Sequence, residues 1–181
     1  MISRVGIAAL RRPRLAGARL AIVMLLAVSA AARSHDDLCA DLLSSDARDA
    51  LRDQFPELYP QQVSDLSAEY QEAWLKEHPH ECPGIAVGHF QSPSKTSYAV
   101  LLVGSKGSLS GSKLVVMTPN ANGTWKVTKL SEEGMAYHYE AVSKVSKARG
   151  PLDQIRFKEF DGGASTYSWT GARFHQTTVK E

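Results

Sequence analysis

Six consecutive residues in the middle of this chain carry no charged side chain: Tyr98-Ala99-Val100-Leu101-Leu102-Val103. A strand with one face in water alternates apolar and polar residues, whereas a run that is apolar on both faces is typical of a strand with cover on each side. We therefore predict that this run forms the centre of a β-sheet.

The sequence after Cys82 consists of short β-branched, aromatic and aliphatic runs separated by Gly, Ser, Asn and Pro, a pattern that indicates an antiparallel sheet. Asn122-Gly123 and Thr170-Gly171-Ala172 supply the residues of tight hairpin turns. The expected strands are 84–90, 98–103, 113–117, 125–130, 154–160, 165–169 and 173–179, with a further one around 135–142. The chain from 83 to 181 is thus expected to be one antiparallel meander of about six to eight strands.

The sequence before Cys82 has the spacing of helices. Apolar residues recur every three to four positions in 44–55 and again in 67–77, and Ser44 or Ser45 is placed to cap the first of these segments. Proline follows each segment closely and predicts where it ends. The segment between the two helices is interpreted as a linker. The fold class is therefore α+β, with two N-terminal helices in 33–82 followed by the meander, in a single domain.

The first 32 residues have the pattern of a secretory signal. Five arginines precede or flank an apolar run from Leu20 to Val28, and Ser29 and three alanines follow. This pattern predicts cleavage after Ala32 and a periplasmic or secreted product. Because the run is shorter than the roughly 20 residues that span a bilayer, no membrane anchor is expected after cleavage.

Removal of this leader changes the charge balance. The whole chain has 21 basic and 19 acidic residues, but all five basic residues of the leader would be lost, which leaves 16 against 19, or −3. Nucleic-acid binding normally requires clustered lysine and arginine, and here they are scattered. We therefore expect no nucleic-acid partner.

The chain has two cysteines, Cys39 and Cys82. An even pair in an exported protein predicts a disulfide. The alternative is a metal site, because His78, His80 and Cys82 alternate along the chain and would point the same way from an extended segment. A ligating Cys82 would leave Cys39 unpaired, so His78 and His80 are only weak candidates, and no metal or cofactor is expected.

The sequence contains no nucleophile elbow and no His-Glu-x-x-His motif. The enzymatic alternative is a small periplasmic hydrolase in which His138 or His89 acts with a carboxylate. The candidate carboxylates are Glu140, Asp153 and Asp161.

Aromatic residues on the expected strands are candidates for binding a partner, because large flat side chains often anchor interfaces. They are Trp125, Tyr137, Tyr139, Tyr167 and Trp169. We expect core packing for at least half of them.

The segments Cys82-Pro83-Gly84, Val87–Phe90 and Tyr98–Leu102 resemble exported bacterial proteins of unknown role that contain a degenerate FG-GAP-like strand-turn-strand unit. Residues 168–174, Ser-Trp-Thr-Gly-Ala-Arg-Phe, are similar to the closing hairpin of that group, so the resemblance extends from about Ser64 onward. Genuine FG-GAP turns resemble calcium-binding loops rich in Asp and Asn. The turn at 91–96 has no carboxylate, so the resemblance implies the fold without calcium, and it assigns no catalytic residue.

These observations favour an exported, non-enzymatic domain that binds another protein or an envelope glycan. The hydrolase is the alternative from a different class. A third possibility is a packing module of an envelope assembly, which would expose a large apolar patch.

Overall fold

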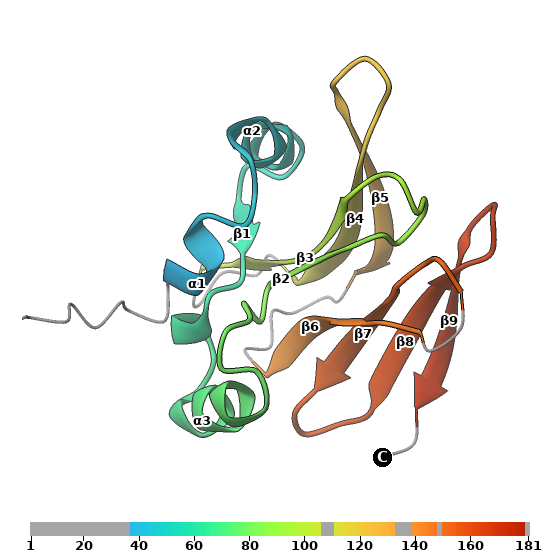
Figure 1. The fold of residues 1–181 in the computed structure, drawn as a ribbon. Coiled ribbons are helices and arrows are strands. Elements are labelled where there is room, and N and C mark those ends of the chain that lie inside the picture. The colour runs from blue at the N-terminus through green and yellow to red at the C-terminus, as the bar shows by residue number, and fades with distance from the viewer. Residues whose placement is uncertain (1–36, 106–110, 133–138, 148–149, 180–181) are drawn as a thin grey trace, which may run out of the picture. The chain divides into compact units, whose positions relative to one another are not determined.

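The computed structural model of this chain describes residues 37–105, 111–132, 139–147 and 150–179 (Figure 1). The expected leader, residues 1–32, lies outside the described residues. The described part contains three α-helices, one short 3-10 helix and nine strands in two antiparallel sheets. None of its helices has both the length and the apolar character that a membrane span requires.

The helices are α1 (Asp37–Ala40), α2 (Ser45–Gln54) and α3 (Ala68–Glu77), and the 3-10 helix is η1 (Val63–Asp65). The hydroxyl of Ser44 accepts a hydrogen bond from the Ala47 amide at 3.3 Å, and the hydroxyl of Ser67 caps α3 in the same way. Such a bond satisfies one of the amides that the first turn of a helix leaves without a partner. The helices expected at 44–55 and 67–77 therefore correspond to α2 and α3.

The first sheet is built around β3 (Ser97–Gly104), which contains the apolar run. On one side β3 pairs with β4 (Lys113–Pro119), which in turn pairs with β5 (Trp125–Glu132). On its other side β3 pairs with both β1 (Leu58–Pro60) and β2 (Ile85–Gly88). The prediction that 98–103 forms a central strand is confirmed, since it has neighbours on both edges and most of its residues are buried.

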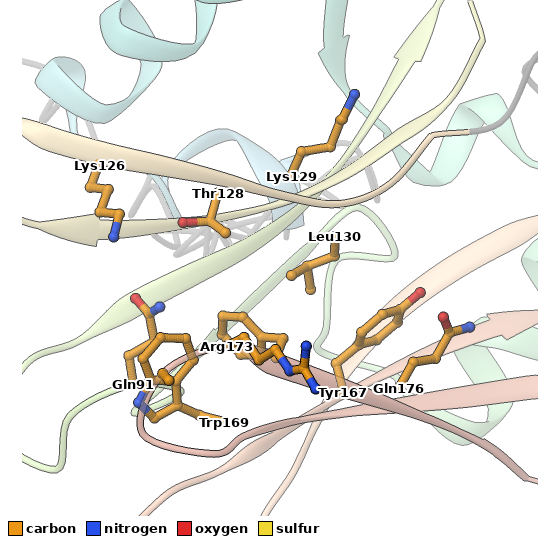
Figure 2. A pocket seen from close by; sticks show the side chains of 11 residues that line it. Gln91, Lys126, Thr128, Lys129, Leu130, Tyr167, Trp169, Arg173 and Gln176 are labelled. Atoms are coloured by element: carbon orange, nitrogen blue, oxygen red, sulfur yellow. The ribbon is translucent and has the colours of Figure 1, made fainter.

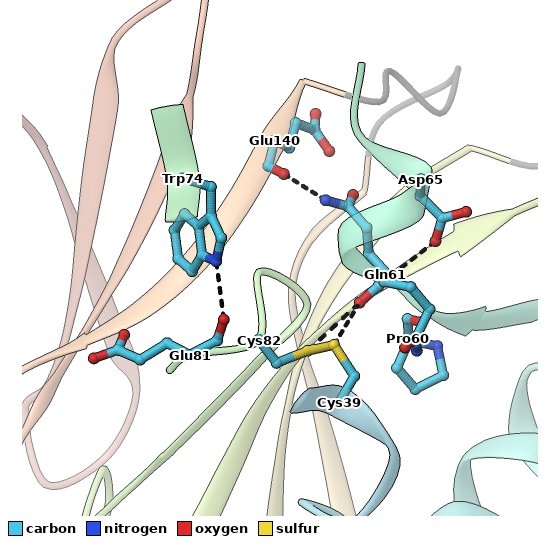
Figure 3. Close-up of a disulfide and its surroundings, with 9 residues drawn as sticks. Cys39, Pro60, Gln61, Asp65, Trp74, Glu81, Cys82 and Glu140 are labelled. Atoms are coloured by element: carbon cyan, nitrogen blue, oxygen red, sulfur yellow. Dashed lines mark hydrogen bonds between the residues drawn. A yellow bond between two sulfur atoms is a disulfide. The ribbon is translucent and has the colours of Figure 1, made fainter. Parts of the chain in front are cut away.

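Strands β1 and β2 meet end to end along one edge of β3, at Leu101. The Leu101 amide donates to the Gly84 carbonyl at 2.8 Å, and the Leu101 carbonyl accepts from the Gln61 amide at 2.9 Å. Gly84 and Gln61 are therefore packed against each other at the point where the two strands converge. The side chain of Gln61 is fully buried, and its Nε2 donates to the Glu140 carbonyl of the second sheet at 2.6 Å (Figure 3).

The second sheet has the order β6-β7-β8-β9, with β6 (Glu140–Val145), β7 (Gln154–Glu159), β8 (Ala164–Trp169) and β9 (Phe174–Val179). It meets the first sheet near β2. There the Val142 amide donates to the Pro83 carbonyl at 2.7 Å, and the Asp153 amide donates to the His89 carbonyl at 3.1 Å.

An apolar core fills the space between the two sheets. It contains Phe90, Ala99, Leu101, Val103, Leu114 and Val116 from the first sheet and its loops, and Val142, Ile155, Phe157 and Tyr167 from the second. These residues alternate along their strands with residues that face away, as expected for two sheets packed face to face. The arrangement is a sandwich joined along β2 and β6.

The opposite face of the first sheet is covered by α1 and α2. Leu43, Ala47 and Leu51 pack there on Val100, Leu102 and Val115. A disulfide joins Cys39 of α1 to Cys82, with a Cα–Cα distance of 5.0 Å, and both sulfurs contact the Gln61 carbonyl oxygen at 3.6 to 3.7 Å (Figure 3). The predicted pairing of the two cysteines is therefore present.

Helix α3 packs against the second sheet. Trp74 is buried beside Leu66 and Ala141, and its indole nitrogen donates to the Glu81 carbonyl at 3.0 Å. Tyr70 stacks on Phe160 with 4.9 Å between ring centroids.

One expectation about the sheet and one about the linker are wrong. The described part of 83–181 contains eight strands, within the expected six to eight, but they belong to two sheets rather than to one meander. The segment interpreted as a linker contains β1, which is only three residues long and ends in Pro60, so it shows no periodicity that a sequence pattern can reveal. Proline is accepted there because β1 is an edge strand.

Candidate functional site

The aromatic residues predicted as binding candidates occupy different environments. The ring centroids of Trp125 and Tyr98 are 5.4 Å apart, and Trp125 packs against the core under the helices. Tyr167 is 4% exposed and belongs to the core between the sheets. Tyr139 is half-buried, Tyr137 lies outside the described residues, and Trp169 is half-buried at the border of a cleft.

This cleft lies between β5 and the hairpin formed by β8 and β9, and it has a volume of about 310 Å³ (Figure 2). β5 and β9 are the terminal strands of their sheets, so the cleft marks the side of the sandwich opposite to the junction of β2 and β6. Its lining residues are Gln91, Lys126, Thr128, Lys129, Leu130, Tyr167, Trp169, Ala172, Arg173, Phe174 and Gln176.

The hairpin between β8 and β9 positions the aromatic wall of the cleft. Gly171 has a φ of 95°, which glycine adopts without strain, and the Thr170 amide donates to the Arg173 carbonyl at 3.0 Å. Trp169 and Phe174 are therefore direct cross-strand partners, with ring centroids 5.1 Å apart. Tyr167 and Gln176 form the next pair on the same face.

A β-bulge shapes the opposite wall. The partner of Leu114 is Ser131 and the partner of Val115 is Lys129, so Leu130 is an extra residue in β5. A bulge redirects the side chains around it. Figure 2 shows Leu130 and Lys126 directed from β5 toward the opposite sheet, whereas the ammonium group of Lys129 is turned away from it.

The charges around the cleft have one sign. Lys126, Lys129 and Arg173 line it, and none of the described lining residues is an aspartate or glutamate. The side chains of Lys126 and Arg173 are exposed, so their charges remain hydrated. Hydrogen bonds fix the orientation of two glutamine side chains in the lining. Gln91 accepts a hydrogen bond from Thr118, and Gln176 donates to the Ser165 hydroxyl at 3.0 Å.

Cations on both walls and an aromatic face suit a ligand with negative charge and a flat or apolar part. Arginine binds carboxylates through paired N–H donors, and tryptophan offers a large face for stacking.

The described histidine and carboxylates of the hydrolase hypothesis make other hydrogen bonds or are buried, and they do not form a His–carboxylate pair. His89 Nδ1 is 3.2 Å from the Lys95 carbonyl oxygen, and Asp153 accepts hydrogen bonds from the His89 amide at 2.9 Å and from Ser146 at 3.1 Å. Asp153 therefore contacts the backbone of His89 and not its ring. Glu140 is buried, Asp161 accepts from the Tyr70 hydroxyl, and His138 lies outside the described residues.

Two of the three residues considered as metal ligands, Cys82 and His78, contact other groups of the protein. Cys82 is oxidised in the disulfide and cannot act as a thiolate ligand. His78 stacks on Trp74 with ring centroids 4.2 Å apart, and its Nδ1 is 3.1 Å from Glu81 Oε2. His80 is exposed. In the described residues no three of the His, Cys, Asp and Glu side chains are grouped as metal ligands would be.

Two tyrosines with raised pKa lie outside the cleft. Burial, followed by the hydrogen bond to Asp65, raises the pKa of Tyr59 to about 12. The hydrogen bond to Asp161, followed by burial, raises the pKa of Tyr70 to about 12. Both shifts favour the neutral phenol, so the stability that these contacts provide is complete below pH 10 and is lost as the pH rises toward 12.

A second hollow, of about 410 Å³, lies beside the disulfide between α2 and β1. Its lining is mainly apolar and includes Leu43, Leu51, Leu58 and Ile85. Arg48 and Arg52 also line it. Arg48 donates to the Ala40 carbonyl at 3.0 Å and Arg52 pairs with Asp49, so both arginines have contacts within the helical segment. This hollow belongs to the packing of α1 and α2.

Sequence reasoning found Trp169 but missed Lys126 and Arg173. One signal was present, because Lys126 and Thr128 alternate with Trp125 and Val127 and so mark a face of β5 that is not wholly apolar. The sequence did not show that this face lies opposite the β8–β9 hairpin.

The turn within the FG-GAP-like unit, which lacks the carboxylates of a calcium-binding loop, connects β2 to β3 and contains Ser92, Pro93 and Lys95. The Lys95 ammonium donates to the Pro119 carbonyl at 3.3 Å. The resemblance itself stays a prediction. Comparison with protein-family models, with curated proteins and with solved structures found no match to this chain.

Proposed function

We propose that this chain is an exported, non-enzymatic domain that binds an anionic partner in the cleft between β5 and the β8–β9 hairpin. The observation that carries the proposal is the charge of this cleft, where cations from both sheets meet an aromatic wall and no described lining residue is acidic. The partner class is a protein segment or an envelope glycan that carries carboxylates or other anionic groups.

The positive charge of the cleft contrasts with the net negative charge of residues 33–181. Residues 33–181 have 16 basic and 19 acidic residues, so this part of the chain has a net charge of −3, whereas every charged residue among the described residues that line the cleft is a cation. A local positive field on an acidic protein attracts anionic ligands and repels cationic ones. Such a field gives selectivity even where each exposed charge contributes little affinity.

The two walls also differ from the rest of the sandwich. Elsewhere the inward positions of the strands hold Leu101, Val103, Val116 and Phe157, which fill the core. At the cleft the lining includes Lys126, Thr128 and Gln176, which cannot stabilise the fold by apolar burial. Polar residues in a concave apolar setting are typical of a ligand site.

The exported state is tested by the mass of the natural product. We expect protein recovered from outside the cytoplasm to begin at Arg33, after loss of 32 residues, because the basic, apolar and small-residue segments of the leader match a signal peptide. It should gain the mass of two hydrogen atoms on reduction, since the Cys39–Cys82 disulfide then opens. Intact-mass spectrometry before and after reduction measures both. An uncleaved chain with free thiols would contradict the proposed export.

The binding site is tested by removing one cation from each wall of the cleft, Lys126 and Arg173. We expect the double variant Lys126→Gln/Arg173→Gln to bind a fluorescein-labelled oligoglutamate peptide or polygalacturonate at least tenfold more weakly than the unmodified protein, which corresponds to about 1.4 kcal/mol. Fluorescence anisotropy at low and moderate salt measures the affinity. Binding should also weaken as salt rises, because exposed charges are screened.

Lys76→Gln is the matched control, because Lys76 is an exposed lysine on α3, outside the cleft. It removes one positive charge from the protein without touching the cleft, and Lys126→Gln alone gives the equivalent single change within it. If Lys76→Gln weakens binding as much as Lys126→Gln, the attraction is a property of the whole surface and the cleft is not the site. Failure of the unmodified protein to bind either anionic probe would also reject the proposal.

A further inference from the structure

The outer edge of β9 has no neighbouring strand among the described residues, because β9 ends the order β6-β7-β8-β9. The direction of its backbone groups follows from the hairpin. The Thr170 amide donates to the Arg173 carbonyl, which makes Thr170 and Arg173 a hydrogen-bonded pair. In an antiparallel ladder such pairs alternate with pairs that do not bond each other. The backbone groups of Phe174, Gln176 and Thr178 therefore point away from β8.

This edge lacks the usual protection against strand addition. Native sheets protect their edges with lysine, proline or bulges. β9 contains neither lysine nor proline, and its pairing with β8 runs without a register shift from Trp169–Phe174 to Ala164–Val179. β5, the terminal strand across the cleft, is different, since it has a bulge at Leu130 and carries Lys126 and Lys129.

The open edge adjoins the cleft. Phe174 and Gln176, whose backbone groups point outward, are the same residues whose side chains line the cleft wall. Side chains of a strand alternate between its two faces. Every second side chain of a strand added beside β9 would therefore be directed toward β5, where Lys126 lies, and one end of that strand would pass Arg173.

We propose that β9 accepts an extended acidic segment of a partner protein as a fifth strand of the second sheet. The backbone groups of Phe174, Gln176 and Thr178 bind the backbone of the segment, and Arg173 and Lys126 hold its carboxylates. The inference rests on the proposed function, which places an anionic ligand in this cleft, and it identifies that ligand as a peptide.

Two other occupants fit less well. A polysaccharide can supply carboxylates, but it has no backbone amides that repeat along the edge at the spacing of a strand, about 6.8 Å for every second residue. A second copy of this chain, paired β9 to β9, would offer the cations of the cleft no carboxylate from the strand itself, because Phe174–Val179 contains neither aspartate nor glutamate. The positive charge therefore favours an acidic peptide.

The experiment compares two changes at one position. Thr178→Pro removes an amide that points outward, and it leaves the ladder with β8 intact because that amide is not part of it. Thr178→Val changes the same exposed side chain and keeps the amide. The probes are a fluorescein-labelled peptide of alternating threonine and glutamate, the same peptide with lysine in place of glutamate, and polygalacturonate.

We expect Thr178→Pro to weaken binding of the acidic peptide at least tenfold, and Thr178→Val to change it less than twofold. The lysine peptide should not bind. In the unmodified protein, saturation with the acidic peptide should slow hydrogen exchange of the Gln176 and Thr178 amides at least tenfold, while the His175 and Thr177 amides change little because they already bond β8.

The possible failures are distinguishable. If Lys126→Gln/Arg173→Gln abolishes peptide binding but Thr178→Pro does not, the cleft binds an anion and strand addition is rejected. Binding of polygalacturonate with no binding of the acidic peptide likewise rejects the peptide and keeps the anionic site. Dimers that form through β9, seen by sedimentation of the unmodified protein and abolished by Thr178→Pro, would make a second copy the occupant and overturn the inference.

Discussion

Replacing Gly84 by alanine is expected to lower the free energy of unfolding by about 3 kcal/mol or more, because the added methyl group has no room. A Cβ atom at Gly84 would stand 2.7 Å from the Gln61 amide nitrogen and 2.8 Å from its carbonyl carbon. Real Cβ atoms do not approach backbone that closely, so one of the two segments has to move.

Neither segment is free to move. Gly84 and Gln61 both bond the backbone of Leu101, at 2.8 and 2.9 Å, and these bonds hold β2 and β1 on the same edge of β3. Gln61 also contacts the disulfide and bonds Glu140 in the second sheet. Displacing it would disturb β1, the disulfide and the joint between the sheets together, which is why the cost should exceed that of ordinary overpacking.

Gly163→Ala is the matched control, because the nearest atom to its added Cβ would be the Val179 carbonyl oxygen at 3.9 Å, an ordinary contact. Urea unfolding followed by circular dichroism measures both variants. We expect Gly163→Ala to lie within about 1 kcal/mol of the unmodified protein, since losing a glycine from a loop also reduces the entropy of the unfolded chain. Equal stability of Gly84→Ala and Gly163→Ala would show that the convergence at Leu101 is not tightly packed.

The sequence predicted elements whose signals are local. β3 was identified because its residues are apolar on both faces, and α2 and α3 because their apolar residues recur at helical spacing and a proline follows closely. β1 was missed because three residues are too few for a period. The division into two sheets was missed because it depends on which strands pair, and strand runs alone do not determine that order.

The candidate site likewise combines residues that the sequence predicted with residues that only the fold brings together. Trp169 was expected from its residue type, and its hairpin from the Thr170-Gly171-Ala172 turn. Lys126 and Arg173 are 47 positions apart in sequence numbering and become neighbours of one cleft only because β5 and β9 end their sheets on the same side of the sandwich. Long-range placement of this kind has no local sequence signal. The positive charge of the cleft could therefore be recognised only from the structure.

Removing the disulfide with the double variant Cys39→Ala/Cys82→Ala is expected to lower the free energy of unfolding by about 4 kcal/mol in the chain-entropy model. The two cysteines are 43 positions apart, so the bond closes a long loop that the unfolded chain would otherwise explore freely. Both residues are buried, at 3% and 1% exposure, and alanine at each site leaves no unpaired polar group.

The structure also predicts which part of the protein should loosen first. α1 has only four residues, and the disulfide connects it to Cys82 beside the sheet. α2 is held by apolar packing, since its residues Ala47 and Leu51 belong to the core formed with the first sheet. Amides of residues 38–43 should therefore lose hydrogen-exchange protection in the variant before those of β3 do. Native exchange at neutral pH measures this order.

Urea unfolding separates the two ways in which the variant can lose stability. If the bond acts by restricting the unfolded chain, its removal lets that chain expand, and the slope of the free energy against urea should rise while the midpoint falls. The unmodified protein unfolded in the presence of a reductant is the control and should give the same slope and midpoint as the variant. A lower midpoint with an unchanged slope would locate the effect in the packing of α1 on the sheet, and an unchanged midpoint would mean that the packing of α1 and α2 holds this end of the protein without the covalent bond.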